Sequence, residues 1–177
     1  MNKKISVCIA TYNGEKYIKE QLLSIIPQLG INDEIIISDD NSSDKTLNII
    51  NEINDNRIKI IINPGEKGYT SNFENALKNA NGDTIFLSDQ DDIWVPNKVK
   101  ICMEYLKDVD FIVSDAMIIN KSGKLINDSF FSMRHPYNTL LGNLYKFGYL
   151  GCCMAFNRII LDKAIPFPKN HKLCTHD

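Results

Sequence analysis

Residues 84–92 read Thr-Ile-Phe-Leu-Ser-Asp-Gln-Asp-Asp. The apolar run Thr84–Leu87 predicts a short strand that is buried on both faces, and the carboxylates that follow it mark its end. Three earlier runs have the same form, with β-branched or apolar residues followed by a polar cluster. These runs span residues 5–10, 34–38 and 58–62.

Apolar residues at helical spacing separate these four runs. The expected helices cover residues 15–28, 46–53 and 69–81, and Asn81-Gly82 supplies a stop signal for the third. Strands that alternate with helices in this way predict βαβ units with right-handed crossovers and a parallel sheet. The predicted fold class is therefore α/β.

The second half of the chain is less regular, and no linker or repeat divides it from the first. We expect a helix at residues 97–106, a strand at 111–119 and a hairpin turn at 120–123. A second strand is expected at 149–156 and a short helix at 158–164. One compact domain over residues 1–177 is the simplest interpretation.

Composition excludes several classes of protein. The formal net charge of the 177 residues is -2, so no basic field favours nucleic acid. No apolar stretch approaches the roughly 20 residues that span a bilayer, and no signal peptide is evident. The five cysteines have no CxxC spacing, which indicates reduced thiols in a cytosol and, for most of them, small core residues.

The polar clusters that follow the four strands are predicted to meet. In parallel sheets, ligands bind outside the carboxyl ends of the strands. The side chains expected on this rim follow the strands in order: Thr11, Tyr12 and Asn13; Asp39 and Asp40; Asn63 with Gly65 and Gly68; and Asp89 to Asp92. The sequence therefore predicts one binding site built from four strand ends.

Asp89 and Asp91 are candidate metal ligands. Carboxylates at i and i+2 beyond a buried strand can turn inward together, and oxygen ligands suit Mg²⁺ or Mn²⁺. Such an ion would neutralise a diphosphate leaving group. The alternative, equally supported by these residues alone, is a solvated acidic turn that caps the next helix.

Asp39 and Asp40 form a second acidic pair on the rim. A carboxylate here could accept hydrogen bonds from a base or from ribose hydroxyls, and we favour this role for Asp39. The alternative is that this segment caps the following helix, which we expect of Asp44. Two acidic clusters on one rim would repel each other unless a cation or hydrogen-bond donors lay between them.

Two further segments could contact a nucleotide. Thr11-Tyr12-Asn13-Gly14 could bring backbone amides and an aromatic ring to a base, although Asn-Gly also suits a simple turn. The loop from Asn63 to Asn72 could follow the nucleotide. Trp94 is expected to fix the acidic loop by packing, and Gly151–Met154 is expected to allow close packing more than to leave room for an acceptor.

Neither a GxGxxG fingerprint nor a GxxxxGK[ST] loop is present, which argues against dehydrogenases and P-loop enzymes. A receiver-type signalling domain would place an acidic pair after the first strand, where Thr11 to Asn13 stand instead. A nucleotidyltransferase would carry a Gly-rich basic loop there. The main alternative to an enzyme is a binding module without catalytic activity.

With these residues in place, the chain resembles the family 2 glycosyltransferases from Ile5 to Asp177. Five segments resemble the family's motifs in the family's order: Ser6–Asn13, Ser38–Asp44, Asn63–Gly68 followed by Asn72, Asp89-Gln90-Asp91, and His176-Asp177. The resemblance implies a GT-A fold, with a mostly parallel central sheet and helices on both faces. It also implies two halves: about residues 1–95 would bind the nucleotide sugar, and residues 96–177 would form the acceptor side.

The resemblance also implies roles for single residues. Asp39 would hold the base, Asp91 would bind the metal, and Asp89 would reach the ribose or a metal-bound water. The donor would also be contacted by Thr11, Tyr12, Asn13, Asp40, Asn72 and Gln90. Asp177 would be the catalytic base of an inverting displacement.

The implied reaction moves a sugar from a UDP- or dTDP-linked donor to a saccharide or lipid-linked acceptor, in cell-surface polysaccharide synthesis. The motif pattern is most similar to that of bacterial rhamnosyltransferases. The implied place is the cytoplasm, near the inner face of the membrane. The sequence stops at Asp177, where family members continue, so we also consider a catalytically impaired donor-binding fragment.

Overall fold

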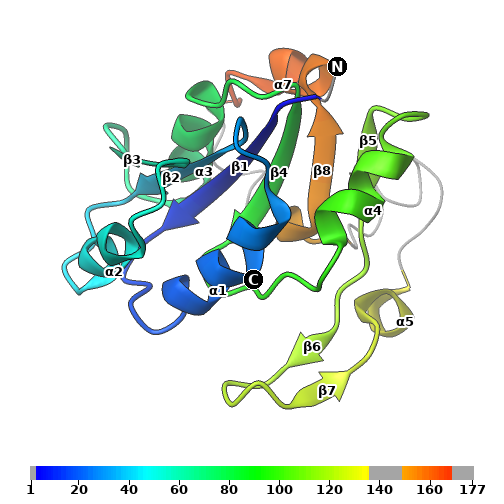
Figure 1. The fold of residues 1–177 in the computed structure, drawn as a ribbon, viewed down its shortest axis with the longest axis horizontal. Helices are drawn as coiled ribbons and strands as arrows, with labels where there is room; N and C mark the ends of the chain where they lie inside the picture. The colour runs from blue at the N-terminus through cyan, green and yellow to red at the C-terminus, as the bar shows by residue number, and fades with distance from the viewer. Residues whose placement is uncertain (1–2, 136–148, 169–177) are drawn as a thin grey trace.

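The computed structural model describes residues 3–135 and 149–168 (Figure 1). Four parallel strands lie at the centre: β1 (Ile5–Thr11), β2 (Glu34–Asp39), β3 (Ile58–Ile62) and β4 (Thr84–Asp89). Two shorter strands complete the six-stranded sheet, β5 (Phe111–Val113) and β8 (Met154–Asn157), in the order β3-β2-β1-β4-β8-β5. β8 runs antiparallel to both β4 and β5. The predicted, mostly parallel sheet is confirmed.

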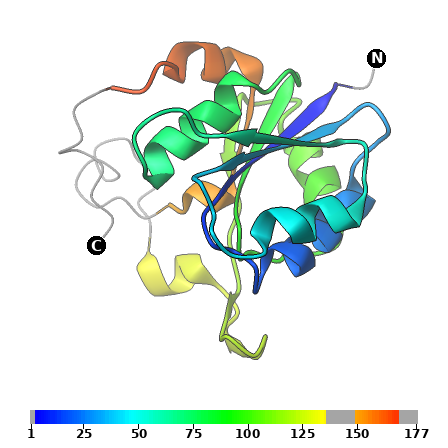
Figure 2. The ribbon, with the colours of Figure 1, turned by 90° about the vertical axis from the view of Figure 1, so that its left-hand side faces the viewer.

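Helices cover both faces of the sheet (Figure 2). One apolar cluster joins Val7, Ile37 and Phe86 to α1 (Ile18–Ile25), α2 (Thr46–Ile53) and α4 (Lys98–Tyr105). A second cluster joins Cys8, Ile36 and Ile85 on the opposite face to α3 (Tyr69–Lys78) and α7 (Arg158–Ala164). Because adjacent strand residues point to opposite faces, a sheet covered on both sides needs the continuous apolar runs seen in the sequence.

The expected helix over residues 15–28 is shorter than its apolar pattern. α1 ends at Ile25, and a 3-10 turn, η1 (Ile26–Gln28), follows. Pro27 lies in this turn and has no backbone N–H, so it cannot donate the bond that would continue the α-helix.

The single strand expected over residues 111–119 is wrong. The structure has β5 and then β6 (Ile118–Ile119), which pairs with β7 (Leu125–Asn127) in a separate hairpin. Asp115 interrupts the run, because its carboxylate accepts hydrogen bonds from Ala116 N (2.8 Å) and Phe131 N (2.9 Å) and holds the start of α5 (Phe130–Arg134). The turn expected at 120–123 is confirmed, with Gly123 at a φ of 76°.

The strand expected over residues 149–156 also begins later. A 3-10 turn, η2 (Gly151–Cys153), comes first, closed by a hydrogen bond from Cys153 N to Leu150 O (3.1 Å). β8 then starts at Met154. Because β8 is antiparallel to β4 and pairs Phe86 with Ala155, η2 falls beside the carboxyl end of β4.

Cys8, Cys102, Cys152 and Cys153 are buried and free, as expected of small core residues. Among the described residues no helix is long and apolar enough to cross a membrane.

Candidate functional site

The carboxyl ends of the parallel strands form one rim, as predicted. Thr11 at the end of β1 pairs in register with Asp39 at the end of β2, and Ala10 pairs with Asp89 at the end of β4. Asn63 follows β3, and its N–H donates to Asp39 O (2.8 Å). The polar segments that the sequence placed together therefore lie next to one another.

The loops after β1 and β2 are joined by their own hydrogen bonds. Asn13, at a φ of 49°, donates from its backbone N–H to Ser42 Oγ (2.9 Å), and its side-chain oxygen accepts from Ser43 N (2.9 Å). Gly14 N donates to Thr46 Oγ1 (2.7 Å), and Glu15 N donates to Asp44 (3.0 Å). The two loops are therefore one folded unit.

Asp39 lies beneath this unit, fully buried. Its carboxylate accepts from Thr11 Oγ1 (3.0 Å), Ser42 N (2.8 Å) and Ser42 Oγ (2.6 Å). These bonds compensate the cost of burying a charge. Contact between Asp39 and a base stays a prediction, because in this structure protein donors surround the carboxylate.

Asp40 holds the loop after β3. It is 6% exposed, and it accepts from Asn63 Nδ2 (3.0 Å) and Gly68 N (2.8 Å). The predicted contact of Asp40 with a donor is not tested, whereas its bonds to the loop are explicit. The helix-capping role expected of Asp44 is confirmed, because Asp44 accepts from Thr46 N (2.9 Å) at the first residue of α2.

Gln90 links the first loop to the acidic loop. Its side-chain oxygen accepts from Tyr12 N (3.0 Å), and its Nε2 donates to Tyr12 O (3.1 Å). A Cβ atom built on Gly14 would lie 2.4 Å from the same oxygen, so glycine leaves room for the Gln90 amide. The structure thus gives Gln90 a positioning role, which the sequence did not indicate.

Tyr12 and Asn72 lie at the same end of β1. The Tyr12 ring is 51% exposed, and Lys67 Nζ lies 5.6 Å from its centroid. Asn72 is buried and donates to Thr11 O (3.0 Å), while its Oδ1 has no hydrogen-bond partner among the described residues. A buried acceptor without a donor is costly, which makes this oxygen a candidate contact for a ligand hydroxyl or N–H that reaches the strand end.

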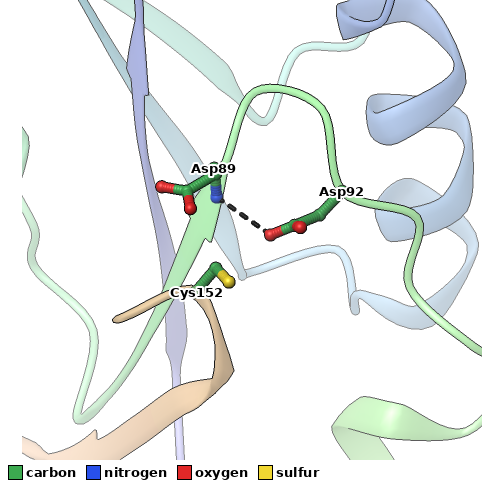
Figure 3. Close-up of side chains that lie close together, drawn as sticks. All are labelled: Asp89, Asp92 and Cys152. Carbon is green, nitrogen blue, oxygen red and sulfur yellow. Dashed lines mark hydrogen bonds between the residues drawn. The ribbon is translucent and has the colours of Figure 1, made fainter. Parts of the chain in front are cut away.

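The acidic loop after β4 brings two carboxylates together (Figure 3). Asp89 N donates to Asp92 Oδ2 (3.2 Å). Asp89, Asp92 and Cys152 each place one potential ligand atom within 4.8 Å of the other two. Burial raises the pKa of Asp92, although the hydrogen bond from Asp89 and the positive charge of Lys98 oppose this effect.

Asp91 is exposed. With Asp92 it lines a hollow of about 240 Å³ between the acidic loop, Tyr17 and Glu20 near α1, and the hairpin turn at Lys121. The predicted metal ligands Asp89 and Asp91 are therefore on one loop, but the structure groups Asp89 with Asp92 and Cys152 instead. The ligand role of Asp91 stays a prediction.

Buried side chains hold the base of the acidic loop. Trp94 is buried against Phe86, and its Nε1 donates to Ser88 Oγ (3.1 Å), as expected of a residue that fixes the loop. Gln21 of α1 is fully buried and donates to Ser88 Oγ (2.9 Å) and to Asp89 O. Gln21 and Cys152 were missed by sequence reasoning, because neither belongs to a motif near the acidic residues.

The expected catalytic base, Asp177, lies outside the described residues. A larger hollow of about 740 Å³ lies beside α2 and the start of β3, at the other end of the strands, and none of the rim acids lines it.

Residues 6–165 match the family described as "Glycosyl transferase family 2". The chain is 31% identical over 174 residues to UDP-Glc:alpha-D-GlcNAc-diphosphoundecaprenol beta-1,3-glucosyltransferase WfgD of Escherichia coli, covering 95% of this chain and 65% of that protein. It is 45% identical over 105 residues to dTDP-rhamnosyl transferase RfbG of Shigella flexneri, covering 55% of this chain and 36% of the relative.

Among solved structures, S. aureus TarS 1-349 in complex with UDP-GlcNAc superposes with a TM-score of 0.74 at 28% identity. The superposition covers 93% of this chain and 48% of TarS. This likeness confirms the predicted fold. The chain spans only about half to two thirds of the length of such proteins.

Proposed function

The chain belongs to glycosyl transferase family 2, and from this premise we propose that it binds a nucleoside-diphosphate sugar and transfers the sugar. UDP- and dTDP-sugars are the proposed donors, because the names of two relatives give these donors. A saccharide or a lipid-linked saccharide is the proposed acceptor, in line with the diphosphoundecaprenol acceptor in the name of the E. coli relative. The proposed reaction is a step of cell-surface polysaccharide synthesis on the cytoplasmic side of the membrane.

The observation that supports this proposal most strongly is the position of the acidic loop. Asp89 ends β4 directly beside Ala10 of β1, so the loop adjoins the unit formed by Thr11, Tyr12 and the loop after β2. A nucleotide at the ends of β1 and β2 would thus point its diphosphate towards the acids. Without a cation, acids on this rim would repel the phosphates.

The donor set of the loop fits a divalent cation. Carboxylate oxygens are the ligands that Mg²⁺ and Mn²⁺ prefer, and a bound cation would neutralise the charge of the diphosphate leaving group. Asp91 and Asp89 are the proposed ligands. Trp94 and Gln21 hold the loop, Gln90 fixes it to Tyr12, and Asn72 offers a buried acceptor at the strand end.

The proposed chemistry is a single inverting displacement. Asp177 takes the proton of the acceptor hydroxyl while the hydroxyl oxygen attacks the sugar. General-base catalysis of this kind typically raises the rate by about 10²–10⁴-fold. Residues 1–95 would hold the donor and residues 96–177 would face the acceptor. Replacing Asp177→Asn should leave donor affinity unchanged and abolish transfer; full turnover by that variant would remove Asp177 from this role.

A thermal-shift screen tests donor binding. A ligand that binds only the native state raises its melting temperature. We expect UDP- or dTDP-sugars to raise the melting temperature with Mn²⁺ and to raise it less without the metal, whereas GDP-sugars serve as the comparison. A chain that gives no shift with any nucleotide sugar, with or without Mn²⁺, would contradict the proposal.

A further inference from the structure

The thiol of Cys152 belongs to the same cluster of potential ligands as the acids of the β4 loop. Its sulfur lies within 4.8 Å of ligand atoms of both Asp89 and Asp92. The residue is buried, at 8% exposed, and Figure 3 shows its thiol beneath the two carboxylates, on a separate segment of chain. The cluster therefore combines two hard oxygen donors with one soft sulfur donor.

The fold fixes this sulfur in place. η2 precedes β8, and the antiparallel pairing of β8 with β4 brings η2 beside the end of β4. Lys98 Nζ donates to Cys152 O (3.3 Å) while it lies 4.6 Å from the centroid of the Trp94 ring. Ser114 N donates to Cys153 O (3.0 Å) on the other side. The backbone of η2 is thus held by both α4 and the segment after β5.

The carboxylate of Asp92 can accept a cation in addition to its existing bond. Asp92 Oδ2 accepts from Asp89 N, but a carboxylate has lone pairs on both oxygens. The Cys152 thiol lies within hydrogen-bonding reach of this carboxylate. A divalent cation can take the place of a proton shared by a thiol and a carboxylate, and the thiol proton then leaves to solvent.

We propose that Asp89, Asp92 and Cys152 form a mixed carboxylate–thiolate site that binds thiophilic divalent cations such as Zn²⁺ and Cd²⁺. Thiolate ligands select such ions, and Mn²⁺ stands at the weak end of the affinity order for divalent metals. Because Asp89 is also a proposed ligand of the hard cation, Zn²⁺ bound here competes with the Mn²⁺-dependent binding of the donor. That consequence rests on the proposed function; binding of the thiophilic ion to the cluster does not.

Titration of the purified chain with Cd²⁺ tests the site, with the ultraviolet charge-transfer absorption of the cadmium–sulfur bond as the readout. We expect Cys152→Ser to weaken Cd²⁺ binding by about 10–100-fold, the loss typical of removing a group that supports a metal site. Cys8→Ser is the matched control, because it removes a buried thiol of β1 that lies outside the cluster, and it should bind Cd²⁺ as the parent chain does. Equal Cd²⁺ affinity in the parent chain and in Cys152→Ser would overturn the proposal.

Asp92→Asn provides a second test that leaves every thiol in place. Asparagine retains an acceptor for Asp89 N but loses the charge, so Cd²⁺ should bind more weakly while the melting temperature in metal-free buffer stays close to that of the parent. If Cys152→Ser does not fold, Asp92→Asn decides, and unchanged Cd²⁺ affinity in this variant would refute the site.

Measuring Mn²⁺-dependent donor binding by calorimetry in the same chains separates the two proposals. If the chain binds the donor with Mn²⁺ and its Cd²⁺ affinity does not depend on Cys152, only the mixed site is refuted. Cd²⁺ binding that depends on Cys152, in a chain that binds no donor, would refute only the proposed function.

Discussion

Two pairs of acids follow two strands of the same sheet, and the structure gives them opposite environments. Asp39 and Asp40, after β2, are 0% and 6% exposed, and donors of the neighbouring loops surround them. Asp91, after β4, is exposed, and Asp92 is half-buried beside Asp89 and Cys152. Acids of the same type at equivalent strand ends therefore differ in their surroundings: the first pair holds loops together, and the second pair lines a hollow beside α1.

Sheet order explains the difference. β2 lies between β1 and β3, both parallel to it, so loops from both neighbours close over its carboxyl end. β4 lies between parallel β1 and antiparallel β8, so only one neighbour ends at the same rim. The other side of the acidic loop meets the start of β8, where η2 lies.

The largest expected effect separates the two pairs by stability. Asp39→Ala removes the acceptor of one buried and two partly buried hydrogen bonds and leaves Ser42 N without its partner, while Thr11 Oγ1 keeps only its longer bond to Ser38 O (3.4 Å), which should cost about 3 kcal/mol. Asp91→Ala, at an exposed position, should change the free energy of unfolding by less than about 0.5 kcal/mol. Urea denaturation measures both values, and equal losses would break the comparison.

The next effect separates the pairs by binding. Asp91→Ala should weaken Mn²⁺-dependent binding of the donor by about 10–100-fold, because a proposed metal ligand is lost. Calorimetry with a UDP- or dTDP-sugar, with and without Mn²⁺, measures this change. Asp108→Ala is the control, since Asp108 is also an exposed acid, follows α4 and has no proposed role at the rim. Unchanged affinity of Asp91→Ala with Mn²⁺ would refute its assignment.

A smaller effect tests the link between the first loop and the acidic loop. Gly14→Ala would place a methyl group 2.4 Å from the Gln90 side-chain oxygen, so the amide must move from Tyr12, at a cost of about 1 kcal/mol. In a Gln90→Ala background the same change should cost less. Urea denaturation of the four chains of this double-mutant cycle gives the coupling energy, and additive losses would show that the two residues do not interact.

The smallest effect concerns a third acid, Asp55, which lies far from both pairs. It shows how much stability the protein loses at low pH through an acid outside the rim. An ion pair with Arg57 (2.7 Å) and hydrogen bonds from that side chain lower the pKa of Asp55 to about 2. Since the folded pKa lies below the unfolded value of 3.8, this stabilisation is present above that value and is lost as pH falls towards 2. Between pH 5 and pH 2.5, the urea midpoint of Asp55→Asn should therefore fall by less than that of the parent chain.

The sequence predicted the central part of the fold because local patterns decide it. The runs of β1 to β4 are apolar on both faces, and each is followed by polar residues, which is enough to predict strands, crossovers and the shared rim. The break after β5 was not predictable from apolar residues alone. It depends on Asp115, whose partners Ser129 and Phe131 come from a later segment.

The candidate site was predicted in its location and only partly in its roles. Asp44 and Trp94 were correct because a helix start and a bulky buried ring carry local signals. The role of Gln90 depends on the backbone of Tyr12, 78 positions earlier in the chain, and that of Cys152 depends on the antiparallel pairing of β8. Such contacts come from the three-dimensional pairing of strands and have no local signature.

Gln90 holds residue 12 by its main chain, which leaves the side chain at this position free to be changed. Both bonds go to the main chain of Tyr12, so any residue except proline can keep them, and the exposed side chain takes no part in them. Position 12 can therefore be varied while the geometry next to the acids is preserved. A library of substitutions there explores selectivity at little risk to folding.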